Sequence, residues 1–171
     1  MNEAMNNLLS RRSIRKYSDR QVPDDLLDQV LEAGLYAPTG MNRQNVIMVA
    51  VRDKETRDLL SKLNAAVMGS DRDPFYGAPC VIVVLGDGDN YPIVENGSLV
   101  LGNLMNAAHA VGLGSCWIHR AKQVFDSPEG KELLKKWGLP EHLQGVGNCI
   151  LGYPAEKPEP KPRLDGRIVK I

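Results

Sequence analysis

Four cations, a serine and a tyrosine fall within seven residues near the start of the chain. Residues 11–17 read RRSIRKY, in a sequence of 171 residues whose 21 Lys plus Arg balance 21 Asp plus Glu. Such a cluster repels itself unless an anion faces it. Arginine makes the forked, two-point contacts that suit a phosphate. The segment is therefore either an anion site or a solvated basic turn after a short helix, and it does not decide between them alone.

A second basic pair, Lys161 and Arg163, lies near the other end of the chain. Both basic groups flank turns or extended segments, so both can point at one site. Between them in sequence lies an amide-rich loop that contains Thr39, Asn42 and Gln44. Cations for a phosphate, together with amides for the edge of a heterocycle, are what a mononucleotide-like cofactor requires.

The sequence gives no support to several other chemistries. The histidines His109, His119 and His142 lack carboxylate or thiol partners at the spacing of metal ligands, so no metal site is expected. No G-x-S-x-G elbow of a hydrolase occurs. The GLG at 112–114 lacks the third glycine of a dinucleotide fingerprint. We therefore expect no catalytic side chain.

The composition, 43% hydrophobic and 25% charged, is typical of a globular protein, and 171 residues suffice for one domain with a real core. The balanced charge gives no field that favours nucleic acid, and the apolar runs are too short to span a bilayer. The first ten residues do not resemble a signal peptide. The thiols of Cys80, Cys116 and Cys149 lie in strand-like runs without a C-x-x-C pair, so we expect inert buried thiols in a cytoplasmic protein.

The elements that must position these residues follow from capping and apolar periodicity. Helices are expected over 2–9, from Pro23 to near Gly34, from a cap at Asp53 to 67, over 93–111, and from a cap at Ser127 to Gly138. Strands are expected at 46–51, 80–85, 115–118 and 145–153, with a turn at 86–89. The polar loop 69–77 is either a lid or plain surface. By itself, the alternation of strands and helices favours a parallel α/β sheet.

The helix expected over 93–111 is rich in small residues, among them Gly97 and Gly102. Glycine inside a helix costs about 1 kcal/mol relative to alanine, so these positions suggest that another element approaches closely. That element is either the protein's own core or the same helix of a second copy.

An extended arm follows the last strand, because prolines alternate with charges through residues 154–163. About ten such residues reach roughly 30 Å. The last residues, 167–171, alternate like a strand, which need not pair within its own chain.

Five short motifs stand in order along the chain: RRSIRKY at 11–17, APTGMNRQ at 37–44, YGAP at 76–79 before a buried strand, GLGSCWI at 112–118, and GYP at 152–154 followed by KPR at 161–163. None is specific alone. Their order and spacing together resemble the nitroreductase family of FMN-dependent enzymes, over nearly the whole chain.

The resemblance implies an α+β fold in which helices flank a mainly antiparallel central sheet. It implies a homodimer with two FMN sites at the subunit interface and a C-terminal strand exchanged with the partner. It also implies a ping-pong reaction, in which NAD(P)H delivers hydride to the flavin N5 and a nitroaromatic, quinone or similar small acceptor is then reduced.

The resemblance assigns cofactor-binding roles to four groups of residues. The phosphate and ribityl chain are assigned to Arg11, Arg12, Ser13, Lys161 and Arg163. Arg15 is placed near flavin N1 and O2, where a cation favours the anionic reduced flavin. The loop that the partner subunit contributes to the flavin site contains Pro38, Thr39, Gly40, Asn42 and Gln44. The strand end that passes the N5 side of the flavin contains Trp117, Ile118, His119 and Arg120.

The chain also departs from the family pattern. Gly40 and Asn45 stand where longer members have Ser and Pro, His119 and Arg120 replace a Glu-Gly pair, and residues 64–77 leave little room for large lid helices. An alternative is a flavin-binding protein of the same fold that stores, senses or breaks down flavin, or takes electrons from a protein donor. A third reading, a basic module for phosphorylated partners, leaves the amide loop and the arm unexplained.

Overall fold

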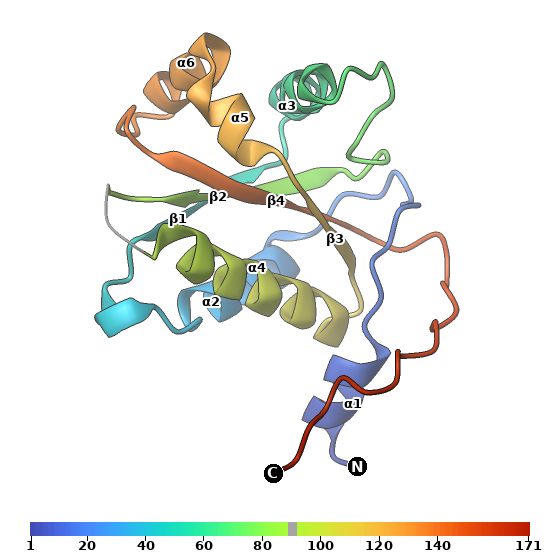
Figure 1. Ribbon diagram of the computed structural model, residues 1–171. Helices are drawn as coiled ribbons and strands as arrows, with labels where there is room; N and C mark the ends of the chain where they lie inside the picture. The colour runs from blue at the N-terminus through green and yellow to red at the C-terminus, as the bar shows by residue number, and fades with distance from the viewer. Residues whose placement is uncertain (89–91) are drawn as a thin grey trace.

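A single antiparallel sheet lies at the centre of the protein (Figure 1). The computed structural model describes residues 1–88 and 92–171. Within these ranges the strand order is β1-β2-β4-β3. The strands are β1 (Val46–Val51), β2 (Cys80–Gly86), β3 (Gly114–Ile118) and β4 (Gln144–Gly152). Every neighbouring pair is antiparallel.

The direction of the strands agrees with the family resemblance and contradicts the parallel sheet that alternation alone favoured. Helix α3 (Lys54–Val67) and the loop 69–77 join β1 to β2. Strand β2 therefore starts beside the C-terminal end of β1, because Val51 pairs with Val81. In a parallel crossover, the second strand would start beside the N-terminal end of the first. Here α3 leads the chain away from the end of β1 and the loop leads it back, which the order of strands and helices in the sequence does not reveal.

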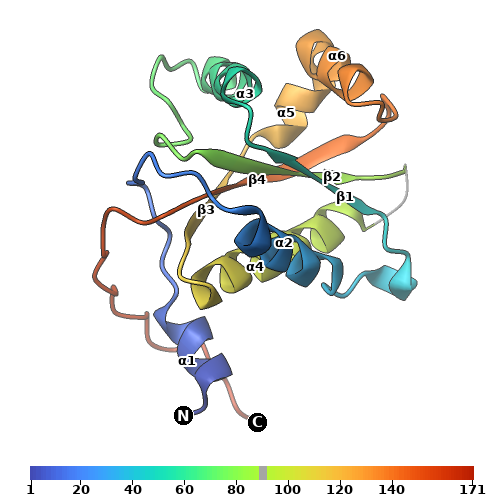
Figure 2. The ribbon, with the colours of Figure 1, turned by 180° about the vertical axis from the view of Figure 1, so that it is seen from behind.

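Helices cover both faces of the sheet (Figures 1 and 2). On one face lie α2 (Asp24–Leu35) and α4 (Ile93–Ala110), and on the other lie α3, α5 (Ala121–Asp126) and α6 (Pro128–Lys136). Strand β2 is buried along its whole length, since its alternate side chains enter the two apolar layers. Burial on both faces explains why its sequence is continuously apolar rather than alternating.

Two of the expected helix caps are confirmed. The Asp53 carboxylate accepts a hydrogen bond from Thr56 N at 2.8 Å, and the Ser127 hydroxyl accepts one from Gly130 N at 3.1 Å. The helix expected from Pro23 begins one residue later, since Pro23 has an extended backbone with ψ 155°.

Two other expectations need a comment. Helix α5 was not expected, because it is only six residues long and follows Arg120 without a side-chain cap. The turn expected at 86–89 is described only in part, since Asp89 lies outside the described residues.

The small residues of α4 have two different surroundings. A Cβ atom on Gly97 would lie 2.7 Å from Val146 Cγ2 of β4, so the protein's own core explains this glycine. A Cβ atom on Gly102 would meet no described atom within 4 Å. In the described ranges, no helix combines the length and apolar character needed to cross a membrane.

Helix α1 (Glu3–Ser10) stands beside the C-terminal end of α4, outside the two helical layers (Figure 1). Asn7 Nδ2 donates to Asn106 O at 2.9 Å, and Ser10 Oγ hydrogen-bonds with His109 Nε2 at 2.8 Å. These two contacts fix the start of the chain, and with it the basic segment that follows.

The arm after β4 turns back towards α1, and both termini emerge at the same end of the molecule (Figures 1 and 2). The strand expected at 167–171 does not form within the described chain. Ile168 and Val169 are 81% and 80% exposed. A strand needs a neighbouring edge to pair with, and this segment pairs with none in its own chain.

Candidate cofactor and substrate site

The basic segment 11–17 lies along the outer edge of β3. Ile14 N donates to Ser115 O at 3.0 Å, and Ser13 and Ser115 form a parallel bridge. Gly114 permits this approach, because a Cβ atom there would lie 2.9 Å from Ile14 Cγ1. The segment is thus a short addition to the sheet rather than a free basic turn.

The start of the C-terminal arm binds the same segment from the other side. Ser18 N donates to Tyr153 O at 3.0 Å, and Ala155 N donates to Lys16 O at 2.9 Å. The backbone of Arg15 donates to the Glu156 carboxylate at 2.5 Å. The segment is therefore held between β3 and the continuation of β4, and its side chains start from a fixed backbone.

Arg11 carries an unmet donor. Its side chain is partly buried, and Nη1 is fully buried with no partner among the described residues. The pKa of the neighbouring His109 is lowered, mainly by burial and also by the positive charges of Arg11 and Arg12. A buried donor left unsatisfied costs about 1–3 kcal/mol. An anion bound beside the exposed part of this side chain would offset the local positive field.

Arg12 is used differently. Its Nη1 donates to Leu9 O and to Arg11 O, both at 2.8 Å. These carbonyls lie at the C-terminal end of α1, where helix carbonyls lack intrahelical partners. Arg12 therefore serves the end of α1, and this nitrogen is not available to a ligand.

Beside the basic segment lies a hollow of about 550 Å³. Arg15 lines it together with the end of β3, so the structure brings Arg15 next to Trp117, Ile118, His119 and Arg120. The remaining wall comes from the region of Met68 to Tyr76. Cationic and apolar side chains thus face one space, which is the combination that a phosphate-bearing aromatic ligand needs.

The corner after β3 is fixed by a buried amide. Asn64, 1% exposed, donates from Nδ2 to His119 O at 2.9 Å. The next residue, Arg120, has a φ of 80°, in the left-handed region that costs a non-glycine residue roughly 1–2 kcal/mol. The hydrogen bond from Asn64 holds His119 at this corner, next to Arg120 at the hollow.

The loop 69–77 is a fixed wall of the hollow. The Asp73 carboxylate accepts from Arg57 and Ser61, each at 2.6 Å, and from the backbone of Phe75 and Gly77 at 2.9 and 2.7 Å. Burial raises the pKa of Asp73, but these hydrogen bonds outweigh it and hold that pKa below its usual value. Phe75 is fully buried beneath the loop. The clamp at Asp73 thus ties the loop to α3.

Sequence reasoning missed the residues that this loop contributes. Met68, Arg72 and Tyr76 line the hollow, although the sequence left the loop undecided between a lid and plain surface. The available signal was the YGAP motif at 76–79, to which no role was given. Cys116 was expected as an inert buried thiol, and it is 2% exposed yet borders the hollow.

The amide loop 38–44 lies elsewhere. Gly40 N donates to Asn96 Oδ1 at 2.9 Å, near the start of α4, whereas the basic segment lies near its end (Figure 1). Asn96 and His109 are thirteen residues apart on one helix, which is about 20 Å. One chain therefore does not bring Pro38, Thr39, Gly40, Asn42 and Gln44 to the hollow.

The amide loop is internally bonded and locally strained. Gln44 N donates to Thr39 Oγ1 at 3.0 Å, and Gln44 Nε2 donates to Asn42 Oδ1 at 3.1 Å. The non-glycine residues with positive φ in the described chain are Met41, Asn42, Gln44, Tyr76 and Arg120. All of them lie in this loop or on the hollow, and strain of this kind clusters at functional sites.

The C-terminal cations also lie outside the hollow. Lys161 and Arg163 are exposed on the arm, and neither lines the space beside Arg15. In the part of the chain that is described, no hydrogen bond or ion pair joins them to residues 11–17. Nor do the described residues include three or more His, Cys, Asp or Glu grouped to hold a metal ion.

Comparison with known proteins gives a consistent result. Residues 8–153 match the model of the nitroreductase family. The FMN reductase (NAD(P)H) of Bacillus subtilis is 30% identical over 186 aligned positions, covering 99% of this chain and 73% of that protein. A nitroreductase from Bacteroides fragilis, crystallised with bound FMN, superposes with a TM-score of 0.92 at 28% identity, covering 100% of both chains. A nitroreductase from Desulfitobacterium hafniense with bound FMN gives 0.90 at 26% identity, covering 100% of this chain and 99% of that one. The chain belongs to the nitroreductase family.

Proposed function

We propose that this protein is an FMN-dependent oxidoreductase that takes reducing equivalents from NADH or NADPH and passes them to a nitroaromatic, a quinone or a similar small acceptor. One observation carries the proposal. The unsatisfied guanidinium of Arg11 and the hollow of Arg15 lie along the same edge of β3, in a chain whose relatives include an FMN reductase.

The residues present fit an FMN molecule. Arg11 and Ser13 would hold the phosphate and ribityl chain, with Lys161 and Arg163 from the arm. Arg15 would lie beside the N1 and O2 edge of the ring. When bound, FMN supplies two-electron chemistry at N5, accepting hydride from the nicotinamide and donating it to the acceptor.

The protein itself would bind FMN, orient it and fix the charge beside its ring. The Arg15 guanidinium has no ion-pair partner among the described residues, so its full charge is available at the hollow. A fixed cation beside a group that becomes negative stabilises the charged form without reorganisation. Trp117 and Ile118 border the hollow at the edge of β3 and would help to exclude water from a flat ring bound there.

The complete site would need two copies of the chain. The amide loop is about 20 Å along α4 from the basic segment, so a homodimer would supply that loop from the partner subunit. The exposed apolar residues of the arm, Leu164, Ile168 and Val169, suit pairing with a neighbouring copy. Residues 1–171 would form one domain, with 154–171 as an arm that reaches the partner.

A cytoplasmic location fits the thiols. All three cysteines are free, and burial raises the pKa of Cys80 to about 12. Free thiols persist in a reducing compartment. Cell fractionation with detection of the untagged protein tests this location, which recovery in a secreted or periplasmic fraction would contradict.

A visible spectrum of the purified protein tests the proposed function. We expect flavin absorption bands, and bleaching of those bands by NADH or NADPH under anaerobic conditions. Regain of the bands on adding a quinone would complete the cycle. A colourless protein that does not take up FMN would overturn the proposal, and a yellow protein that neither nicotinamide bleaches would limit it to flavin binding.

A further inference from the structure

We propose that the hollow beside Arg15 selects substrates that carry an anionic group, a carboxylate or a phosphate, over neutral ones of the same shape. This inference rests on the proposed function, because it concerns the space where substrate would meet the flavin. It adds the charge class of the substrate, which the match to the family leaves open.

The lining of the hollow is unbalanced in charge. Three arginines, Arg15, Arg72 and Arg120, line it, against one described carboxylate, that of Asp73. The oxygens of Asp73 are already occupied by the clamp, in which Arg57 supplies the compensating charge. Since Arg15 is assigned to the edge of the flavin ring, Arg72 and Arg120 are the cations that remain for a substrate, and neither has a counter-charge among the described residues of the hollow.

The guanidinium groups of these arginines are also free of hydrogen bonds and ion pairs elsewhere in the described ranges. Only the backbone nitrogens of Arg15 and Arg72 donate, to Glu156 and Ser70 respectively. A cleft lined by one sign of charge concentrates its field and raises the local concentration of opposite charges. An incoming anion thus meets donors that need no rearrangement of existing bonds.

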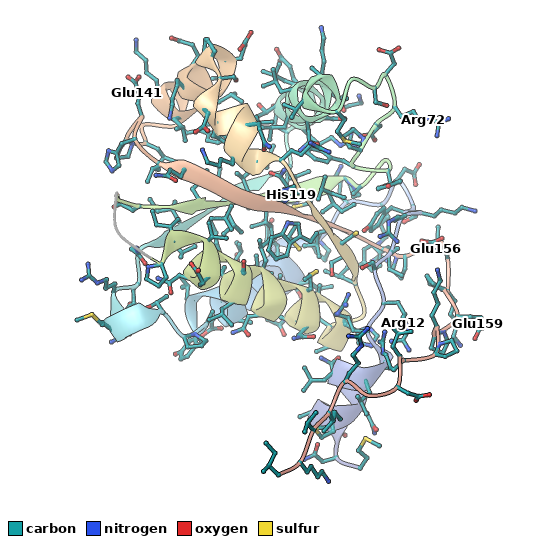
Figure 3. The ribbon with its side chains drawn as sticks, viewed as in Figure 1. Arg12, Arg72, His119, Glu141, Glu156 and Glu159 are labelled. Carbon is teal, nitrogen blue, oxygen red and sulfur yellow. The ribbon has the colours of Figure 1, made fainter. Side chains whose placement is uncertain are left out.

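The three cations come from three separately fixed elements. Arg15 belongs to the basic segment, Arg72 to the loop clamped by Asp73, and Arg120 to the corner held by Asn64. Figure 3 shows Arg72 extending outward from its loop, and His119, which is also exposed, directly follows the end of β3. Arg120 is partly buried, so it is placed for direct contact, whereas Arg72 at the rim acts on encounter.

The remaining lining defines the body of the ligand. Met68, Tyr76, Trp117 and Ile118 contribute apolar surface to the same hollow. An aromatic ring with an attached anion fits both features. The anion can belong to the acceptor, as a carboxylate, or to the nicotinamide donor, as a phosphate, and the experiment below separates these sources.

The first measurement uses no turnover. Oxidised, FMN-loaded protein is titrated with benzoate and with benzamide, and binding is followed by the change in the flavin absorption bands. We expect benzoate to bind about tenfold more tightly at low salt, and about 0.5 M NaCl to remove most of that preference. Equal affinities for the two ligands at low salt would overturn the proposal.

The second measurement compares para-nitrobenzoate with para-nitrobenzamide as acceptors. Arg72→Gln and Arg120→Gln should each lower the ratio of their kcat/KM values by about three- to tenfold. Lys135→Gln on α6, which does not line the hollow, removes a charge that is exposed like that of Arg72, and as a control it should leave the ratio unchanged. If Arg120→Gln fails to fold, Arg72→Gln in the exposed loop still gives the answer.

A third measurement identifies the source of the anion. The KM for NADH is compared with that for N-benzyl dihydronicotinamide, a neutral donor without phosphates. If Arg72→Gln and Arg120→Gln raise only the KM for NADH and leave the ratio of the two acceptors' kcat/KM values unchanged, the arginines bind the donor phosphates. If these variants change only that ratio, the arginines bind the acceptor. No change in either quantity overturns the proposal. Because only FMN-loaded protein that NAD(P)H reduces is used, this failure is distinct from a failure of the proposed function.

Discussion

The two ends of helix α4 carry opposite kinds of chemistry. At its C-terminal end the basic segment presents cations, and one buried guanidinium nitrogen of Arg11 has no partner among the described residues. At its N-terminal end Asn96 holds a loop that carries a single cation, Arg43, and whose amides bond one another, as Gln44 does with Asn42. Among the described residues, the cations of the basic segment form no ion pair, whereas the amides at the other end of α4 bond one another. This difference is what the proposed dimer would explain, because a second copy would bring the two kinds of group to one site.

The two ends of α4 also differ in the kind of unfavourable energy that they contain. The amide loop contains three non-glycine residues with positive φ, Met41, Asn42 and Gln44, whereas the basic segment contains none. Backbone strain is therefore found at one end of α4, and cations without ion-pair partners among the described residues are found at the other. Both are costs that a bound ligand can relieve.

The largest expected effect comes from removing charge at the cationic half. Arg11→Ala combined with Arg163→Ala should weaken FMN binding by about a hundredfold or more, because each charged hydrogen bond is worth about 1.5–3 kcal/mol. Titration of the quenching of FMN fluorescence measures the change. Lys135→Ala on α6 serves as the control. Unchanged FMN affinity in the double variant would refute the phosphate assignment.

The next effect tests whether α4 meets a second copy. Gly102→Phe should leave the fold intact, since no described atom lies within 4 Å of its Cβ position. If another α4 packs there, association should weaken about ten- to a hundredfold, because overpacking costs about 1–3 kcal/mol. Sedimentation over a range of concentrations measures it.

Gly97→Ala gives the contrasting result. Its Cβ atom would lie 2.7 Å from Val146, so it should lower the free energy of unfolding by about 1–3 kcal/mol without changing association. An unchanged dimer in Gly102→Phe would remove this face of α4 from the interface.

A mixing experiment sharpens the comparison between the halves. Arg11→Ala impairs the cationic half, and Asn42→Ala with Gln44→Ala impairs the amide half. If each site combines halves from two copies, refolding the two variants together should restore about a quarter of the flavin sites, since half of the dimers are mixed and each has one intact site. The flavin absorbance of the mixture measures this. Recovery no greater than the average of the separate variants would mean that both halves act within one chain.

The smallest effect concerns the wall of the cationic half. Asp73→Asn should lower the free energy of unfolding by about 1–2 kcal/mol at neutral pH, since a charged acceptor for Arg57 is lost and the carboxylate is partly exposed. The folded-state pKa of Asp73 is below its usual value, so its contribution is complete above that usual value and is lost as the pH falls through the folded-state pKa. In denaturant unfolding, the difference in the free energy of unfolding between the unsubstituted protein and Asp73→Asn should therefore disappear below about pH 4. A difference that remains in acid would mean that the charge of Asp73 does not cause it.

Much of the fold could be predicted because its signals are local. The strands around Val46–Val51 and Cys80–Gly86 are continuous apolar runs, and the caps at Asp53 and Ser127 follow from side-chain chemistry. Strand direction is not a local property. It depends on how far α3 and the loop 69–77 together displace the chain, so the antiparallel sheet came from the family resemblance and not from the residues. Helix α5 was missed because six residues after a left-handed Arg120 give no periodic signal.

The site was predictable to a smaller extent. The family resemblance assigned Arg15 to one edge of the flavin and residues 117–120 to its N5 side, and the structure brings Arg15 together with Trp117 and Arg120 at the hollow. The use of Arg12 on the end of α1 was not predictable, because it depends on where Leu9 O lies. The contribution of Arg72 to the hollow depends on the clamp at Asp73, which joins residues far apart in sequence.

The hydrogen bond between the Arg15 backbone and Glu156 has a consequence for biosynthesis, because it joins residues 141 positions apart. A ribosome adds about 5–20 residues per second, so the basic segment waits on the order of ten seconds for its last hydrogen-bond partner to be synthesised. The contacts with α4 and β3 form from residues made earlier, and the contact with Glu156 completes the set.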